Sequence, residues 1–159
     1  MILLTVGTQL GFDRLVAAMD AIAPDLDQPL IAQTGPGRYT PLHMQAEPFF
    51  RPSDFEELVA RSMLIIAHAG IGSVLSARRH NTPIVLMPRR AKLGEHRNDH
   101  QLATAAHLRD REMIFVADDE SDLPGAIERA LAAGQSAHQS QPTGLVQLQS
   151  AISAFILGD

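Results

Sequence analysis

Two glycine-containing segments carry residues suited to holding an anion. Gly70, Gly72 and Ser73 follow one apolar run, and Gly7 with Thr8 follows another. Glycines let a backbone approach a ligand closely, and free N–H groups at the start of a helix attract negative charge. The dinucleotide-binding fingerprint is incomplete, because a leucine stands where its third glycine is expected. A plain tight turn is therefore the alternative to a phosphate site.

A basic segment lies beyond the second glycine turn. Residues 78–97 include six cationic side chains and one acidic side chain. Of the thirteen Lys and Arg residues in the chain, all but one are arginine, which suits bidentate contact with phosphate or carboxylate. A solvated loop with scattered charges is the alternative. The closeness of the glycine turn favours anion binding by Arg89, Arg90 or Lys92.

A dense polar cluster follows, made of Glu95, His96, Asn98, His100 and Gln101. These polar groups exceed what capping a helix requires, so we expect contacts with sugar hydroxyls, above all from Glu95 and Gln101. The alternative is a capped, solvent-facing helix end. A further option is a metal-dependent hydrolase that binds zinc through His96 and His100. A zinc-protease motif would need glutamate directly after the first histidine, where this chain has arginine, and we expect no metal.

His68 directly follows a predicted buried strand. An imidazole in this position is suited to polarising or protonating a substrate group, which makes His68 the catalytic candidate. A purely structural role, in which the ring hydrogen-bonds the neighbouring backbone and shapes the turn, is the alternative.

The composition describes a chain that can fold as one domain. Its 159 residues are 45% hydrophobic and 19% charged, which provides enough apolar material for a core. The net charge of −5 argues against non-specific binding to nucleic acid, and the absence of cysteine excludes disulfides and thiolate metal sites. No apolar run is long enough to span a membrane and no signal peptide is recognisable, so we expect a cytoplasmic protein.

Apolar periodicity predicts short strands alternating with helices. The strands are expected at 2–6, 30–33, 45–50, 63–67, 83–87 and 113–116, and the helices at 12–22, 53–61, 73–80, 98–108 and 122–133. Ser53 and Glu56 form a predicted capping box at the start of the second helix. Alternation of this kind indicates an α/β fold, a Rossmann-like parallel sheet with crossover helices.

The predicted fold also places the site. Ligands of parallel sheets bind beyond the carboxyl ends of the strands, and Gly7-Thr8, His68–Ser73 and Pro88–Glu95 each follow a predicted strand. We therefore expect these three segments to meet at one edge. Residues 1–133 are expected to form the binding domain, residues 134–144 a polar linker, and residues 145–159 a C-terminal helix packed on the domain or on a partner.

Taken in order, these motifs resemble the carboxy-terminal domain of glycosyltransferase family 28. The resemblance rests on Leu3–Thr8, His68–Ser73, Pro88–Arg90 and Gly94–Gln101, which together extend over most of the chain. Small stand-alone members are the most similar. They include the catalytic subunit of the two-part N-acetylglucosaminyltransferase of lipid-linked oligosaccharide synthesis, and bacterial exopolysaccharide subunits that act as glucuronosyltransferases.

The resemblance implies one half of a GT-B enzyme, which transfers a sugar with inversion from a UDP-sugar to a lipid-linked saccharide acceptor, without a metal or other cofactor. A separate membrane-anchored subunit would bind the acceptor and hold this chain at the inner membrane face, so activity is expected only with that partner. The diphosphate would be held by Gly7, Thr8, Gly70, Gly72 and Ser73, supported by Arg89 and Arg90. The sugar or ribose would contact Glu95, His96, Asn98, His100 and Gln101.

The sequence departs from the family pattern at two positions. Ser76 stands where members often carry an acidic residue that holds the ribose, so ribose contact is expected to shift to Glu95. Asn81 replaces the usual glycine before the next strand and can adopt a left-handed C-cap conformation. The general base is expected in the partner, with His68 as the local candidate. A non-catalytic, nucleotide-binding regulatory module is the alternative function, although it leaves the polar cluster unexplained.

Overall fold

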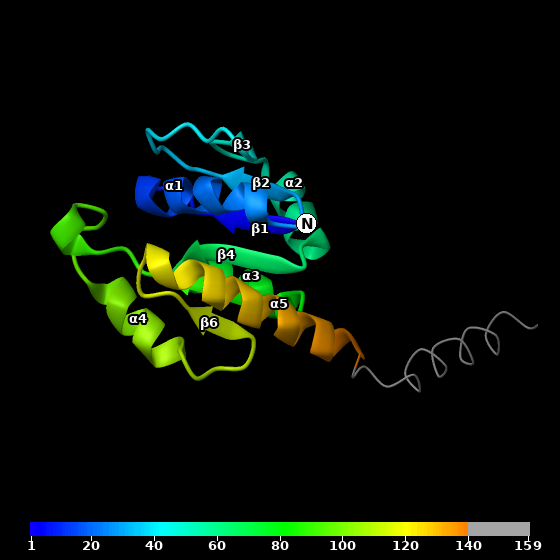
Figure 1. Ribbon diagram of the computed structural model, residues 1–159. Helices are drawn as coiled ribbons and strands as arrows, with labels where there is room; N and C mark the ends of the chain where they lie inside the picture. Colours follow the sequence, from blue (N-terminus) through cyan, green and yellow to red (C-terminus); the bar gives the residue numbers. More distant parts are fainter. Residues whose placement is uncertain (140–159) are drawn as a thin grey trace, which may run out of the picture.

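Six parallel strands form a single sheet in the computed structural model, which describes residues 1–139 (Figure 1). Their order across the sheet is β3-β2-β1-β4-β5-β6. The strands are β1 (Ile2–Thr5), β2 (Leu30–Gln33), β3 (Gln45–Glu47), β4 (Leu64–His68), β5 (Ile84–Met87) and β6 (Ile114–Val116). The prediction of a Rossmann-like parallel α/β sheet is confirmed.

The centre of the sheet is buried on both faces. In the register, Leu4 of β1 lies between Ala32 of β2 and Ile66 of β4. All four residues of β1 are buried, as are the first four residues of β4. Parallel strands read as continuous apolar runs because helices cover both of their faces, and this is why these two strands were recognisable in the sequence.

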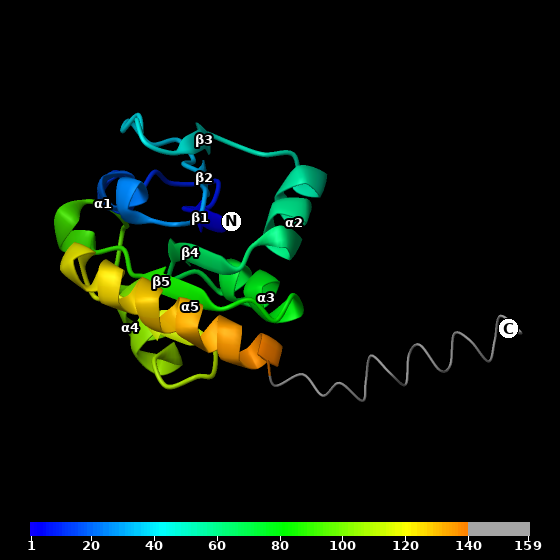
Figure 2. The ribbon, with the colours of Figure 1, turned by 45° about the vertical axis from the view of Figure 1, so that its right-hand side comes forward.

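Helices form a layer on each face of the sheet (Figures 1 and 2). One face packs Ile2 and Leu4 against α1 and α5, while Leu3 on the opposite face belongs to the cluster with α2, α3 and α4. The helices are α1 (Asp13–Ile22), α2 (Pro52–Arg61), α3 (Ile71–Arg79), α4 (His100–Leu108) and α5 (Leu123–Gln139). Short 3-10 turns are η1 (Ala23–Asp25), η2 (Ala91–Leu93) and η3 (Glu120–Asp122).

The start of α2 differs from the prediction. Its N-cap residue is Arg51 and its first residue is Pro52, so the predicted capping box of Ser53 and Glu56 is wrong. Ser53 lies inside the helix, where its hydroxyl donates to Asp54 Oδ1 at 3.2 Å. Proline is favourable at the first helical position because the N–H that it lacks would have no partner there.

The end of α5 also differs from the prediction. The helix continues to Gln139, so residues 134–139 are helical rather than part of a linker. The predicted linker residues 140–144 and the predicted helix 145–159 lie outside the described residues. Asn81 adopts the expected left-handed conformation, with φ of 52°. Among the helices of residues 1–139, none has the length and apolar character needed to cross a membrane.

Candidate functional site

The carboxyl ends of β1 and β4 lie side by side, and the chain leaves them toward opposite faces of the sheet. β1 leads to α1 on one face, and β4 leads to α3 on the other. Adjacent connections on opposite faces leave a crevice, which is where open α/β sheets bind ligands. Gly7-Thr8 and His68–Ser73 flank this crevice, and Pro88–Glu95 follows the neighbouring strand β5. The three segments therefore share one edge, as predicted.

A cavity of about 330 Å³ occupies the crevice. Its lining includes the predicted site residues Gly7, Thr8, His68, Gly72 and Ser73. It also includes residues that were not predicted as ligand contacts: Thr5, Gln33, Phe50, Pro52, Phe55 and Ser76. The cavity thus combines the polar ends of three strands with apolar surface from the start of α2.

Gln33 and Thr5 connect the loops around the cavity. Gln33 Nε2 donates to Thr5 Oγ1 at 3.3 Å, and Gln33 Oε1 accepts the Phe50 N–H at 3.1 Å. The Gly7 N–H donates to the same Thr5 hydroxyl oxygen at 3.3 Å. Thr5 and Gln33 are the last residues of β1 and β2. A polar residue closing an otherwise apolar strand was the signal that would have identified them.

The site glycines make room for different groups. A Cβ atom on Gly70 would lie 2.3 Å from His68 Nε2, and a Cβ atom on Gly7 would lie 3.1 Å from Cε1 of the same ring. These two glycines therefore admit the imidazole. A Cβ atom on Gly72 would meet no atom within 4 Å. The first turn of α3, whose N–H groups have no partner within the helix, thus faces open space at Gly72.

His68 is held as a neutral imidazole. Burial lowers its pKa from the ordinary 6.5 to about 4, with smaller contributions from the positive charge of Arg89 and from His96, while the Thr5 backbone opposes the shift. At neutral pH the ring therefore has one N–H donor and one acceptor nitrogen. It is suited to hydrogen bonding, and it is a weak base.

Arg89 lies beneath the loop that joins β1 to α1. It is only 4% exposed, and its Nη2 donates to the carbonyl oxygens of Val6 and Leu10 at 2.8 and 2.6 Å. Its guanidinium carbon is 5.1 Å from the centroid of the Phe12 ring. Arg89 does not line the cavity. Instead it fixes the loop that carries Gly7 from below.

The chain matches the model of the glycosyltransferase family 28 C-terminal domain over residues 1–153. The chain belongs to this family. Solved structures with the same fold include the kitacinnamycin glycotransferase, with 15% identity and a TM-score of 0.64. They also include the calicheamicin glycosyltransferase, with 17% identity and a TM-score of 0.60, and MurG from Acinetobacter baumannii, with 21% identity and a TM-score of 0.55.

Each of these three comparisons covers 84% of the chain. The chain spans only 36%, 35% and 44% of those proteins, respectively. The neighbours are GT-B glycosyltransferases, and the family 28 domain corresponds to one half of that fold. No curated protein matches the chain.

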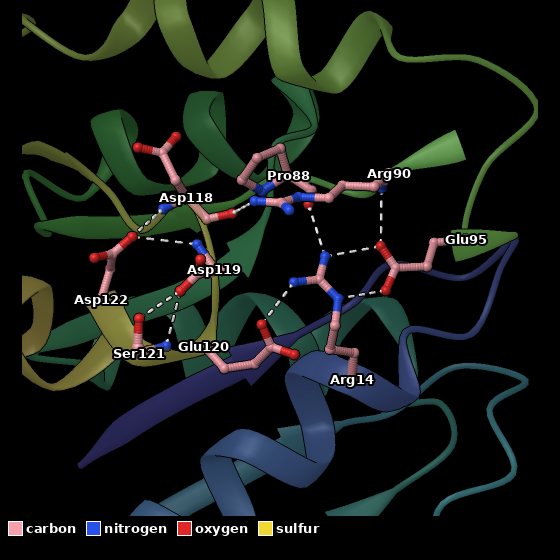
Figure 3. A network of polar contacts seen from close by, with 9 residues as sticks. All are labelled: Arg14, Pro88, Arg90, Glu95, Asp118, Asp119, Glu120, Ser121 and Asp122. Carbon is pink, nitrogen blue, oxygen red and sulfur yellow. Dashed lines mark hydrogen bonds and ion pairs between the residues drawn. The ribbon is translucent and has the colours of Figure 1, made fainter. Parts of the chain in front are cut away.

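In the family 28 domain, Glu95 is held from two sides (Figure 3). Arg14 donates from Nε and Nη2 to the two Glu95 carboxylate oxygens at 2.5 and 2.8 Å, and the Arg90 N–H donates to Oε2 at 2.8 Å. Arg14 also reaches Pro88 O at 3.2 Å and Glu120 at 3.1 Å. The hydrogen bond to Glu95 raises the pKa of Arg14. A sugar hydroxyl would thus meet a carboxylate whose two oxygens are already engaged.

Arg90 extends away from the cavity. Its Nη2 donates to the Asp118 carbonyl oxygen at 2.7 Å, just before the turn that Asp119 and Asp122 cap (Figure 3). Neither arginine of the predicted diphosphate contacts therefore lines the crevice. The position of Arg89 and Arg90 near the glycine turn in the sequence did not indicate where their side chains point. Those directions depend on contacts with β1, α1 and the segment after β6.

The predicted polar cluster is divided between several environments. A second hollow of about 650 Å³ lies between the β1–α1 and β5–α4 loops, lined by Gln9, Leu10, Gly94, Glu95, His96 and Arg97. His100 contacts Asn98 through Nδ1, and its ring centroid lies 4.5 Å from that of His96. Gln101 is 3% exposed, and its Oε1 accepts the Arg89 N–H at 3.1 Å. Gln101 thus supports the end of β5.

Metal binding was the alternative role of His96 and His100. Across residues 1–139, no group of three or more His, Asp or Glu side chains is arranged to hold a metal ion. Transfer without a metal stays a prediction.

Proposed function

We propose that this family 28 domain is the donor-binding subunit of an inverting glycosyltransferase of polysaccharide synthesis. The donor would be a UDP-sugar, with glucuronate or N-acetylglucosamine as the transferred sugar, and the acceptor a lipid-linked saccharide. The supporting observation is the cavity at the β1–β4 crevice, onto which the first turn of α3 opens at Gly72. This is the arrangement expected for a phosphate group held by backbone N–H groups.

The diphosphate would lie between the Gly7-Thr8 turn and the first turn of α3. The acceptor hydroxyl oxygen would attack the anomeric carbon from the face opposite UDP, and the bond from that carbon to the diphosphate oxygen would break. The electron pair would leave with UDP, so negative charge on the diphosphate grows as the bond lengthens. Preorganised N–H groups and the Thr8 and Ser73 hydroxyls would stabilise that charge.

His68 would hydrogen-bond a substrate oxygen in its neutral form. A base with a pKa of about 4 takes up the acceptor proton poorly near neutral pH. The general base is therefore assigned to the partner subunit. Arg89 would contribute positive potential from beneath the Gly7 loop, and Glu95 would contact sugar or ribose only by exchanging part of its pairing with Arg14.

A separate, membrane-anchored subunit would supply the acceptor-binding half and hold this chain at the inner membrane face. The support is the resemblance of the site motifs to small family members that pair with a membrane-associated chain. Apolar side chains at the carboxyl edge agree with a covered surface, since Phe49 is 51% exposed and Ile71 is 54% exposed. No metal or other cofactor enters this proposal.

The test is a calorimetric titration of the purified chain with UDP, UDP-glucuronate, UDP-N-acetylglucosamine, NAD and ATP. We expect the uridine compounds to bind with the highest affinity, and we expect Ser73→Ala to lower that affinity. Preference for NAD or ATP would instead support a nucleotide-binding regulatory module. Transfer to a lipid-linked acceptor should require co-expression with the partner, and full transfer by the chain alone would contradict the two-subunit proposal.

A further inference from the structure

Two buried polar residues line the cavity at the β1–β4 crevice, which we call the crevice cavity. Thr5 and Gln33 are 2% and 4% exposed, and they are register partners at the ends of β1 and β2. Side chains alternate between the two faces of a strand, so Thr5 points to the same face as Leu3, which α2, α3 and α4 cover. Buried polar groups cost stability unless they are hydrogen-bonded, so the partners of both side chains can be followed one by one.

The hydrogen bonds of these two residues run in one direction. The Phe50 N–H can only donate, and it donates to Gln33 Oε1 at 3.1 Å. This fixes the orientation of the carboxamide, so its Nε2 faces Thr5 and donates to Thr5 Oγ1 at 3.3 Å. The Gly7 N–H donates to the same oxygen at 3.3 Å. The Thr5 hydroxyl oxygen therefore accepts two hydrogen bonds.

One hydrogen is left over at the end of this series of hydrogen bonds. A hydroxyl group has two acceptor lone pairs and one O–H donor. Both lone pairs of Thr5 Oγ1 are occupied, and within residues 1–139 its hydrogen has no acceptor. Hydrogen bonds that follow one another in one direction polarise each other, which strengthens the last donor. The Thr5 hydroxyl hydrogen is thus available to a molecule in the crevice cavity.

The same contacts determine which groups of the Gly7-Thr8 turn can reach a phosphate. The Gly7 N–H is already engaged by Thr5, so it is not available to a ligand. We infer that the Thr5 hydroxyl takes its place and donates to a diphosphate oxygen of the nucleotide-sugar. Gln33 is then a positioning residue, which keeps this hydroxyl hydrogen turned toward the cavity. An O–H group that donates to an anionic oxygen forms a short and strong hydrogen bond. The inference rests on the proposed function and adds a ligand contact at the end of β1.

NMR titrations of the full chain with UDP and with uridine test this contact. Thr5→Val keeps the shape of the side chain but removes the hydroxyl. It should lower the affinity for UDP about tenfold or more, because a hydrogen bond to a charged group contributes that much. Uridine has no phosphate, so its affinity should change less than about twofold. Thr5→Ser keeps the hydroxyl and should bind UDP within about threefold of the parent chain. An equal loss of UDP and uridine binding in Thr5→Val, or an equal loss of UDP binding in both variants, would overturn the inference.

Gln33→Met tests the positioning role and leaves Thr5 unchanged. A thioether cannot donate to Thr5 Oγ1, so the ratio of UDP affinity to uridine affinity should fall about threefold or more. Thr82→Val, at a buried threonine before β5, and Gln45→Met, at an exposed position in β3, are matched controls that should bind UDP like the parent chain. An unchanged ratio in Gln33→Met would contradict the positioning role.

Urea denaturation shows which variants fold, and Gln33→Met decides the test if Thr5→Val does not fold. UDP binding by the parent chain that Thr5→Val leaves unchanged refutes this inference alone. Absence of UDP binding by the parent chain refutes the proposed function, and the inference fails with it.

Discussion

Replacing His68 should remove a defined part of the pH dependence of folding. In the folded chain burial lowers the pKa of His68 from 6.5 to about 4. An unfolded chain takes up the proton near 6.5, so between these two values the unfolded state binds more protons and stability falls as the pH falls. The stability that depends on a neutral His68 is fully present above pH 6.5. It is lost progressively as the pH falls to about 4, and it changes little below that value.

The size of the effect follows from the shift. A lowering from 6.5 to about 4 corresponds to roughly 3 kcal/mol of unfolding free energy. His68→Gln keeps a polar side chain of similar size but has no titrating group. When the pH falls from 7 to 4, the free energy of unfolding of the variant should therefore decrease by about 3 kcal/mol less than that of the parent chain.

Urea denaturation at several pH values measures this difference. Carboxylates titrate in both proteins and cancel in the comparison. His107→Gln, at an exposed position on α4, is the matched control for the loss of a histidine. If the His68→Gln curve runs parallel to the parent curve, the imidazole is not held neutral by burial, and the reasoning about its role as a hydrogen-bonding group fails.

Three further predictions concern folding and donor binding. Gly70→Ala should cost about 1–3 kcal/mol of stability, because its Cβ would overlap the neighbouring imidazole. Gly72→Ala should change stability by less than about 1 kcal/mol, but it should still weaken the binding of UDP measured by calorimetry. Arg14→Met and Glu95→Gln should show a coupling of about 1–3 kcal/mol in a double-mutant cycle followed by urea denaturation, and additive effects would refute the clamp in Figure 3. Asp20→Ala should cost about 2–3 kcal/mol, because two backbone N–H groups and a tyrosine hydroxyl lose their acceptor, and an unchanged melting temperature would count against this.

The sheet and the position of its site were predictable because local patterns determine them. The apolar runs at Ile2–Val6 and Met63–Ala67 have the length of strands covered on both faces, and each is followed by a glycine-containing turn. Carboxyl ends of parallel strands share one edge, and this brought Gly7 together with His68 in the structure. Pro52 shows the limit of such patterns, because a favourable first helical residue outweighed the capping signal at Ser53.

The partners of the charged side chains were not predictable from the sequence. Arg14 and Glu95 are 81 positions apart, and Arg89 meets the Val6 carbonyl oxygen across 83 positions. Motif spacing describes neighbours along the chain and contains no information on such contacts. The direction of each long arginine side chain depends on which element packs above its strand end. For the same reason Gln101 was predicted to contact the sugar, although it is buried on α4 and its side chain accepts the Arg89 N–H.

The structure also separates cations that a charge count treats as one cluster. Arg89 is buried and shapes the Gly7 loop, Arg90 is bound near Asp118, and Lys92 with Arg97 faces outward. The charge of Arg89 is nevertheless felt at the crevice, since it contributes to the low pKa of the imidazole there. A potential that disfavours a second positive charge favours a negative one. We therefore expect a diphosphate in this cavity to be stabilised by the field of a cation that it does not touch, together with direct contacts from backbone N–H groups.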